Sequence, residues 1–521
     1  MNNFNYDSLD YLTVTRKLLD DTVWTTIKDR FIGDSGSGDG VIAHGSEWFS
    51  GLFDAGSYKI DGTDTSFHNP RFVKFLDNYT DILIKPFEEA IKLDKQVIVQ
   101  MSLHPRTSNC DWIETNYFKP LFKKYKNLLD KMRNGEAHLL LFFGWEADNF
   151  SKDNTSFPKK GKYDSYYSMF DAVRTSYDLP SESIIILNSN LLGYAQEKSN
   201  YGEDLNHGEY TQVIYESAFE LNTFKSQKGK WNPEYTFDEH ISNLKNNDIK
   251  KMLRINRTQL GCRDMMLYWL EKTGYVKDTI VEHRAKEKFN DSYFKKEINP
   301  WLKQDEEPEY DYYAVKYYLD ECKKMAERLD FTNVLEGFDF NENIIKQIEN
   351  NSPYIASKDE LLGSFSDIYS NEYIPMDCYQ RTLFSWVSTS LTDRFDQVFI
   401  NASTFQPMLN YHPIIFNSNR EHNYYMKLSG FKDYSWFSEV ETVDMCPTQH
   451  ERMVLNTNEI DKLMKKSKDE LINLIIDNRE SLEYNRKLLF ECKSIENIIK
   501  KLFVIINKKF IDSTGNFKEL L

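Results

Sequence analysis

Short apolar runs of strand length recur in the first half of the chain, at intervals that leave room for a helix. These runs are residues 41–43, 96–101, 138–143 and 183–187. Residues 118–132 and 163–177 have the apolar spacing of helices, and so do residues 9–31, which precede a glycine-rich turn. Strands that alternate with helices indicate an α/β fold, and we expect the last three runs to be neighbouring parallel strands.

A second alternating unit begins near residue 250. Its predicted strands are residues 252–255, 279–282, 382–387, 397–400 and 413–416. A predicted helix at residues 264–272 ends at Gly274, a residue type that commonly follows a helix C-terminus. Residues 283–351 interrupt the alternation, because they are polar and acidic and have a helical stretch at 312–328. We interpret them as an insertion or a lid.

The two units predict two Rossmann-like domains that face each other across a cleft. We place the N-terminal domain at residues 1–247 and the C-terminal domain at residues 248–466, with the acidic helical insertion at about 283–351. Residues 467–521 form a tail of helical pattern, which either extends away or packs back on the first domain.

Composition narrows the class of protein. Hydrophobic residues make up 40% of the 521 residues, which is enough for packed cores, and the formal net charge is −16. An acidic chain gains little free energy from electrostatic attraction to a polyphosphate backbone, and we therefore do not expect it to bind nucleic acid. A nucleotide needs only one or two local cations and stays compatible with this charge.

Cysteine, histidine and apolar spacing indicate neither a metal site nor a membrane span. The six cysteines include no C-x-x-C pair, and the ten histidines include no H-E-x-x-H. Scattered thiols suit a reducing compartment. No apolar run reaches the ~20 residues that cross a bilayer, and residues 1–10 lack a signal-peptide pattern. We therefore expect a cytoplasmic protein or a component of a virus particle.

Polar residues that follow a predicted strand in the C-terminal half are the strongest candidates for a ligand site. Asn401, Ser403 and Thr404 come after the predicted strand at 397–400, where a helical pattern begins. Ligands bind at the carboxyl ends of strands in open parallel sheets, where helix N-termini offer free N–H groups to phosphates. A buried strand, a helix and a further strand at residues 441–444 are predicted to follow.

This stretch resembles a family of glycosyltransferase-like proteins from phages, large viruses and marine bacteria, which is distantly similar to fucosyltransferases. The matching residues are Thr404, Phe405, Pro407, His412, Pro413, Ile414, Ile415, Gly430, Phe431, Lys432, Glu441, Asp444 and Arg452. Upstream, Ile255-Asn256-Arg257 and Cys262-Arg263 occupy the places of two further family motifs. The resemblance implies a GT-B-like fold and transfer of a sugar from a nucleotide-sugar donor to an acceptor hydroxyl, without metal or cofactor.

The resemblance also implies donor-binding residues. Arg257 and Arg263 would hold the diphosphate by bidentate hydrogen bonds, near the turn at residues 401–404. Glu441 or Asp444 would hold hydroxyls of the ribose or the sugar. Alternatively, the two arginines cap a helix or pair with surface carboxylates.

Several charged positions depart from the family pattern. Ala402 and Ser403 replace a Glu-Lys pair that helps to bind the sugar nucleotide in the related fucosyltransferases. An acidic residue is missing near Thr389, and Cys262 replaces a histidine. Such losses are expected of a degenerate enzyme or of an enzyme with a different donor.

Two residues of the N-terminal half are candidate catalytic groups. His104 and Glu146 each follow a predicted strand, where a parallel sheet delivers side chains to a ligand. An inverting transferase needs one general base to deprotonate the acceptor hydroxyl. Otherwise each of the two is an ordinary solvated side chain or a helix cap.

Three functions remain open at this point. The leading hypothesis is a hexosyl- or fucosyl-type transferase that acts on a glycan or protein acceptor. The main alternative is a catalytically degenerate relative that serves as a virion or interaction protein. A glycosyltransferase that modifies DNA conflicts with the acidic charge, unless basic residues gather on one face.

Overall fold

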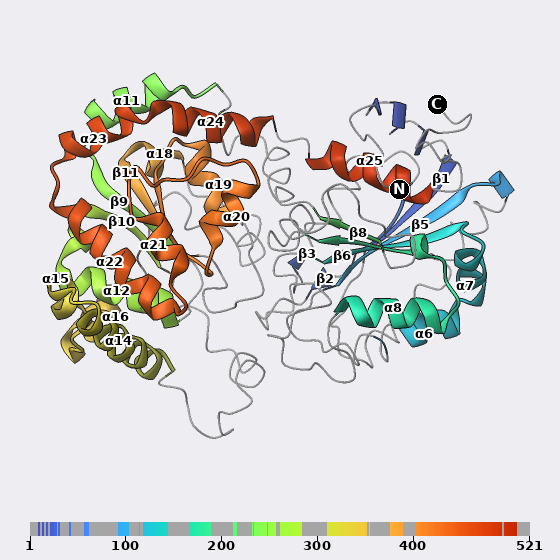
Figure 1. Ribbon diagram of the computed structural model, residues 1–521, viewed down its shortest axis with the longest axis horizontal. Coiled ribbons are helices and arrows are strands. Elements are labelled where there is room, and N and C mark those ends of the chain that lie inside the picture. The colour runs from blue at the N-terminus through green and yellow to red at the C-terminus, as the bar shows by residue number, and fades with distance from the viewer. Residues whose placement is uncertain are drawn as a thin grey trace.

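The chain, described by a computed structural model, is an α/β protein with two parallel sheets (Figure 1). The structure describes residues 9–10, 13–14, 17–18, 21–28, 30–31, 41–42, 57–61, 92–103, 114, 118–143, 166–188, 212–215, 232, 234–246, 248–256, 261–283, 310–351, 354, 376–388, 402–491 and 494–507. No helix within these ranges is long and apolar enough to cross a membrane.

The larger sheet has the strand order β4-β1-β5-β6-β7-β8, and every pairing in it is parallel. Its strands are β1 (Thr22–Lys28), β4 (Ser57–Asp61), β5 (Gln96–Leu103), β6 (Ala137–Phe143), β7 (Ile184–Asn188) and β8 (Gln212–Tyr215). The prediction that residues 96–101, 138–143 and 183–187 are neighbouring parallel strands is confirmed. A separate antiparallel pair is formed by β2 (Arg30–Phe31) and β3 (Val41–Ile42).

Three helices and one 3-10 turn lie between strands of this sheet in the described chain. They are α6 (Lys119–Lys124), α7 (Lys126–Arg133), α8 (Tyr166–Ser176) and η3 (Ser181–Ser183). The helical stretch predicted at residues 118–132 is broken at Tyr125, which separates α6 from α7.

The second sheet has the strand order β10-β9-β11-β12, again parallel throughout. Its strands are β9 (Lys250–Asn256), β10 (Thr279–His283), β11 (Thr382–Ser388) and β12 (Ile414–Asn417). They confirm four predicted strands, whereas the one predicted at 397–400 lies outside the described residues. The connecting elements are α12 (Gly261–Thr273), η6 (Tyr275–Asp278), α18 (Met376–Gln380) and α19 (Ala402–Leu409).

The strand order of the second sheet creates a point where the winding reverses. The chain moves from β9 to β10 in one direction across the sheet and from β11 to β12 in the other. Right-handed crossovers therefore place α12 and α19 on opposite faces. Open α/β sheets bind ligands at such a reversal, outside the carboxyl ends of the strands, which here are the ends of β9 and β11.

The helices of the acidic insertion form a layer of the second core. They are α14 (Tyr310–Arg328), α15 (Thr332–Leu335), η7 (Glu336–Phe338) and α16 (Glu342–Asn351). Figure 1 shows them beside α12, and α14 also contacts α22 (Gln449–Lys465). Leu319 and Phe338 belong to the same hydrophobic cluster as Trp269 of α12 and Trp386 of β11. The described part of the insertion is thus packed into the core.

The last helices are divided between the two sheets. Apolar side chains of α23 (Lys468–Asp477) and α24 (Arg479–Phe490) belong to the second core, together with α11 (Phe237–Asn246). Helix α25 (Ser494–Ile506) instead contacts β8, and its Leu502 and Phe503 cluster with Leu140 and Ile185 of the first sheet. Of the two possibilities for the tail, packing back on the first half of the chain is the one observed.

Two predicted elements are wrong. The helix predicted at residues 9–31 gives way to β1 and β2 after residue 21, because the run from Thr22 to Ile27 is rich in β-branched and aromatic residues that favour strands. The strand predicted at residues 441–444 is part of helix α21 (Val440–Met445). Val440 and Val443 are buried and Glu441 is exposed, which is the three-residue spacing of a helix face.

Candidate functional site

Two buried arginines lie at the reversal point of the second sheet. Arg254 of β9 is 0% exposed, and its Nη2 donates a hydrogen bond to the main-chain oxygen of Arg263. Arg263, in the first turn of α12, donates from its Nη2 to the oxygen of Ser388, the last residue of β11, at 3.3 Å. The two guanidinium groups therefore tie together the ends of β9 and β11 and the start of α12.

Arg254 and Arg263 place two positive charges in the protein interior, away from solvent. Burial lowers the pKa of Arg254 to about 9, and burial also lowers the pKa of Arg263. Arg254 therefore stays cationic at neutral pH. The charged groups that act on its pKa include one carboxylate, Asp264, and a second guanidinium, Arg263. Buried charge is costly unless it is compensated, and the carboxylate of Asp264 offsets part of that cost.

A buried polar side chain lies at the end of the neighbouring strand. Asn417 closes β12 and is 1% exposed. Its Nδ2 lies 3.4 Å from Oγ of Ser388, the residue that pairs with it across the sheet. Its Oδ1 accepts no hydrogen bond in the described part of the chain, which is unusual for a buried amide oxygen. The same edge of the sheet thus holds two cations and an unsatisfied acceptor.

Arg452 fixes the loop that follows β12. This buried side chain of α22 donates from Nε to the oxygen of Ser418 at 2.9 Å, and from Nη1 to the oxygen of Cys446 at 2.8 Å. Arg452, one of the residues on which the predicted resemblance rests, therefore supports the backbone at the carboxyl edge of the sheet.

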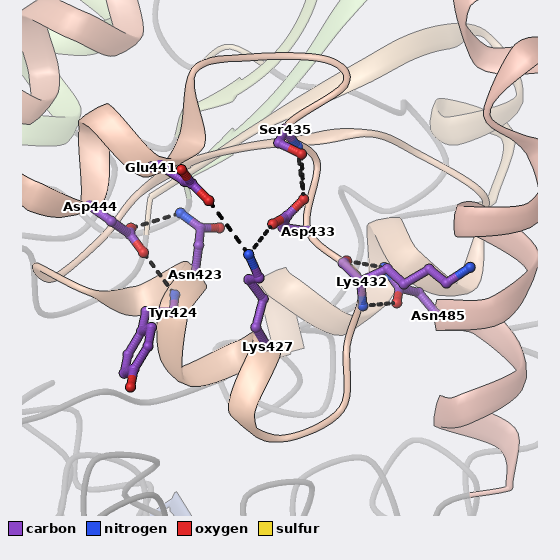
Figure 2. A network of polar contacts seen from close by, with 9 residues as sticks. All are labelled: Asn423, Tyr424, Lys427, Lys432, Asp433, Ser435, Glu441, Asp444 and Asn485. Carbon is purple, nitrogen blue, oxygen red and sulfur yellow. Dashed lines mark hydrogen bonds and ion pairs between the residues drawn. The ribbon is translucent and has the colours of Figure 1, made fainter.

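Asp444, a predicted donor-binding residue, is engaged by the start of α20 (His422–Leu428), as Figure 2 shows. Its carboxylate accepts hydrogen bonds from Nδ2 of Asn423 and from the main-chain N–H of Tyr424, both at 2.8 Å. Burial raises the pKa of Asp444 to about 6, although these hydrogen bonds oppose the shift. Asp444 thus satisfies donors that a helix N-terminus otherwise leaves open.

Glu441, the other predicted acidic residue, faces solvent. Its side chain is 81% exposed, and it forms an ion pair of 3.6 Å with Lys427 (Figure 2). Lys427 lies closer to Asp433, at 2.9 Å, and the hydrogen bond with Asp433 raises the pKa of Lys427. Exposed pairs of this kind contribute little to stability.

The Gly-Phe-Lys motif after α20 has roles in folding. Gly430 has a φ of 97°, a left-handed conformation that favours glycine after a helix. Phe431 is buried. The main-chain N–H and oxygen of Lys432 are bound by the side chain of Asn485 from α24, at 2.8 and 2.7 Å (Figure 2).

The remaining predicted residues are only partly described. Ser403 and Thr404 lie in the first turn of α19; Thr404 is fully buried, and its Oγ1 has no hydrogen-bond partner in the described ranges. Four predicted site residues lie outside the described residues: His104, Glu146, Arg257 and Asn401.

Sequence reasoning missed Arg254 and Asn417. The available signal for Arg254 was a charged residue inside an otherwise apolar predicted strand, since a buried arginine must find partners. Asn417 directly follows the apolar run of β12 and had the same kind of signal.

Comparison with known proteins adds no assignment. No family model matches the chain, and no curated protein matches it. Among the described residues, no group of three or more His, Cys, Asp or Glu side chains is placed to hold a metal ion.

Proposed function

We propose that the chain is a metal-independent glycosyltransferase-like protein of the GT-B type, which binds the diphosphate of a nucleotide sugar at the carboxyl ends of β9 and β11. The observation that carries the proposal is the pair of buried guanidinium groups, Arg254 and Arg263, at the reversal point of the second sheet. Diphosphate release develops negative charge, and preorganised cations are an effective way to stabilise it.

The architecture supports a Rossmann-like pairing of two domains. In each sheet the strand that comes first in sequence lies inside the sheet, next to the strand that comes third. Helix α25 packs on the first sheet after α24 packs on the second, so the chain connects the two halves twice. Two open sheets joined in this way suit a donor side and an acceptor side.

The acceptor side would lie at the carboxyl ends of β5 and β6. These strands are neighbours, with Leu103 opposite Phe143 at their ends. His104 follows the first end directly and Glu146 follows the second by three residues, so either is a candidate general base for the acceptor hydroxyl.

A matched pair of arginine variants tests the donor site. Arg263→Lys replaces the guanidinium at the reversal point with a single ammonium group, and Arg486→Lys makes the same change at a second buried arginine. Arg486 donates to the oxygen of Leu409, at the C-terminal end of α19, which leads into the amino end of β12. Both variants lose buried hydrogen bonds, but only one alters the proposed site.

Calorimetric titration with a panel of nucleoside diphosphates distinguishes them. We expect binding by the unchanged protein, a loss of about 1.5–3 kcal/mol in Arg263→Lys, and unchanged affinity in Arg486→Lys. Equal affinity in all three proteins, or no binding by the unchanged protein, would remove the basis of the proposal.

A second candidate function, a degenerate relative that serves as a scaffold, is favoured by one observation. Three described motif residues, Asp444, Arg452 and Gly430, have clear roles in folding, and such roles persist without catalysis. Release of nucleoside diphosphate from a broad panel of nucleotide sugars separates the candidates. Binding without release supports the scaffold, and release supports the enzyme.

A further inference from the structure

A concentration of positive charge lies on the first sheet, away from the proposed donor site. Between residues 119 and 133, six side chains are basic and one is acidic; they are Lys119, Lys123, Lys124, Lys126, Lys131, Arg133 and Asp130. The whole chain has a formal net charge of −16, so this segment reverses the charge locally. It forms α6 and α7.

These two helices and Tyr177, which follows α8, line an open pocket of about 330 Å³. Phe122, Leu129 and Tyr177 give it an apolar side, where the rings of Phe122 and Tyr177 lie 4.7 Å apart. The charged residues that line it are Lys119, Lys123, Lys126, Arg133 and Asp130. The volume lies within the range of small-molecule sites, and the lining carries an excess of three positive charges.

The cations of this pocket differ in how they are held. Arg133 is oriented by hydrogen bonds from Nε to the oxygen of Tyr177, at 2.9 Å, and from Nη1 to Asp130, at 3.3 Å. Lys119 forms an ion pair of 3.3 Å with Glu114. Lys123 and Lys126 are exposed, and in the described part of the chain neither forms an ion pair. Two lysines are therefore available beside an oriented arginine.

We propose that this pocket is an anion site that binds a small phosphorylated compound. Lysine binds phosphate as a compact point charge, and arginine adds directional donors. Tyr177 adds a phenol, which is a hydrogen-bond donor at neutral pH.

The site is distinct from the proposed donor site. Arg133 ends α7 and Tyr177 follows α8, and these helices lead into the amino ends of β6 and β7. Ligands that take part in the chemistry of open α/β sheets bind at the opposite, carboxyl edge. The pocket therefore suits an effector or an anchoring group, and it does not depend on the proposed glycosyl transfer.

Titration of the full-length protein with inorganic pyrophosphate tests the site. The variant Lys123→Gln/Lys126→Gln removes the two available cations, and Lys245→Gln/Lys346→Gln removes two exposed lysines on helices of the second core. We expect the unchanged protein to bind pyrophosphate in a salt-sensitive phase. Its affinity should be about tenfold or more weaker in Lys123→Gln/Lys126→Gln and unchanged in Lys245→Gln/Lys346→Gln. Arg263→Lys should leave this phase unchanged.

Several results would overturn the inference. They are no pyrophosphate binding, equal loss in both lysine variants, or loss of the phase in Arg263→Lys. A single-stranded oligonucleotide provides the last arm. If it binds through Lys123 and Lys126 while pyrophosphate does not, the patch recognises a polyanion, and the small-ligand proposal is wrong.

Discussion

Gly337 offers a direct test of how firmly the acidic insertion belongs to the second core. It lies in η7, and a Cβ added there would stand 2.6 Å from Cδ1 of Trp269 and 3.3 Å from Cγ2 of Thr273. Trp269 is fully buried and packs edge-on against Trp386, with ring centroids 6.0 Å apart. The buried indole can therefore move away only by displacing its neighbours.

The expected loss follows from overpacking. Forcing an extra methyl group into a packed core typically costs about 1–3 kcal/mol. We expect Gly337→Ala to lie near the upper end, about 3 kcal/mol, because the obstacle is a rigid buried ring. Gly274→Ala is the matched control: its φ of 75° brings strain, but no atom lies within 4 Å of the added Cβ. That control should lose about 1 kcal/mol.

Both variants replace glycine with alanine, which alters the free energy of the unfolded chain by about 0.4–1 kcal/mol. This contribution is the same in the two variants and cancels when they are compared. The difference of about 2 kcal/mol therefore reports the clash itself. Urea unfolding followed by far-ultraviolet circular dichroism measures it as a shift of midpoint at constant slope. If Gly337→Ala unfolds within about 0.5 kcal/mol of Gly274→Ala, η7 does not rest on α12, and the insertion is a lid that opens.

Three further stability measurements test the polar contacts around β12. Arg452→Met should lose about 3 kcal/mol in urea unfolding, because the buried oxygens of Ser418 and Cys446 lose their donors; a loss below 1 kcal/mol would contradict these hydrogen bonds. Asp444 has a pKa of about 6 in the folded protein, above its ordinary 3.8. The contribution of the protonated carboxyl to the free energy of unfolding is therefore complete below about pH 3.8, and it is lost as the pH rises through 6. Asp444→Asn should therefore gain stability relative to the unchanged protein between pH 4.5 and pH 7.5, and a pH-independent difference would refute this. His422 has a pKa of about 3 in the folded protein, below its ordinary 6.5, so its contribution to the free energy of unfolding is complete above pH 6.5 and declines by about 3 kcal/mol towards pH 4. His422→Phe should lack that decline, and an equal decline in both proteins would show that another group causes it.

In the first sheet, the strands that the sequence identified, β5, β6 and β7, all lie inside the sheet. β6 and β7 contain continuous apolar runs, and the neighbours of a central parallel strand must be apolar on both sides. β4 reads Ser-Tyr-Lys-Ile-Asp and β8 spans only four residues. Both lie at the edges of this sheet and are defined by pairing with a single neighbouring strand, which local sequence pattern does not reveal.

The sequence pointed to the edge of the sheet where the candidate site lies, but not to all the residues that form it. Strand alternation led to the carboxyl edge of the second sheet, and Arg263 lies there. Arg254 was not predicted as a site residue, because its contact is with Arg263 of α12, and the sequence does not show that α12 packs against this part of β9. The hydrogen bonds of Asp444 to α20 were not predicted, because Asn423 and Tyr424 lie on a different helix, and no spacing rule links a cap to a helix about twenty residues away.

The roles of the motif residues change what the motif can tell about function. Gly430 permits a left-handed turn, Asp444 caps α20, and Arg452 holds two backbone oxygens, so each would be retained by any protein that keeps this fold. These roles therefore belong to the fold and are neutral about catalysis. Arg254 and Arg263 are different, because a buried guanidinium is costly to desolvate and these two lie where open α/β sheets bind ligands. If replacing both by apolar residues of similar size stabilised the protein while nucleoside diphosphate binding disappeared, the pair would be a feature of binding and not of folding. If stability fell and binding stayed, the arginines would join the other motif residues as supports of the sheet.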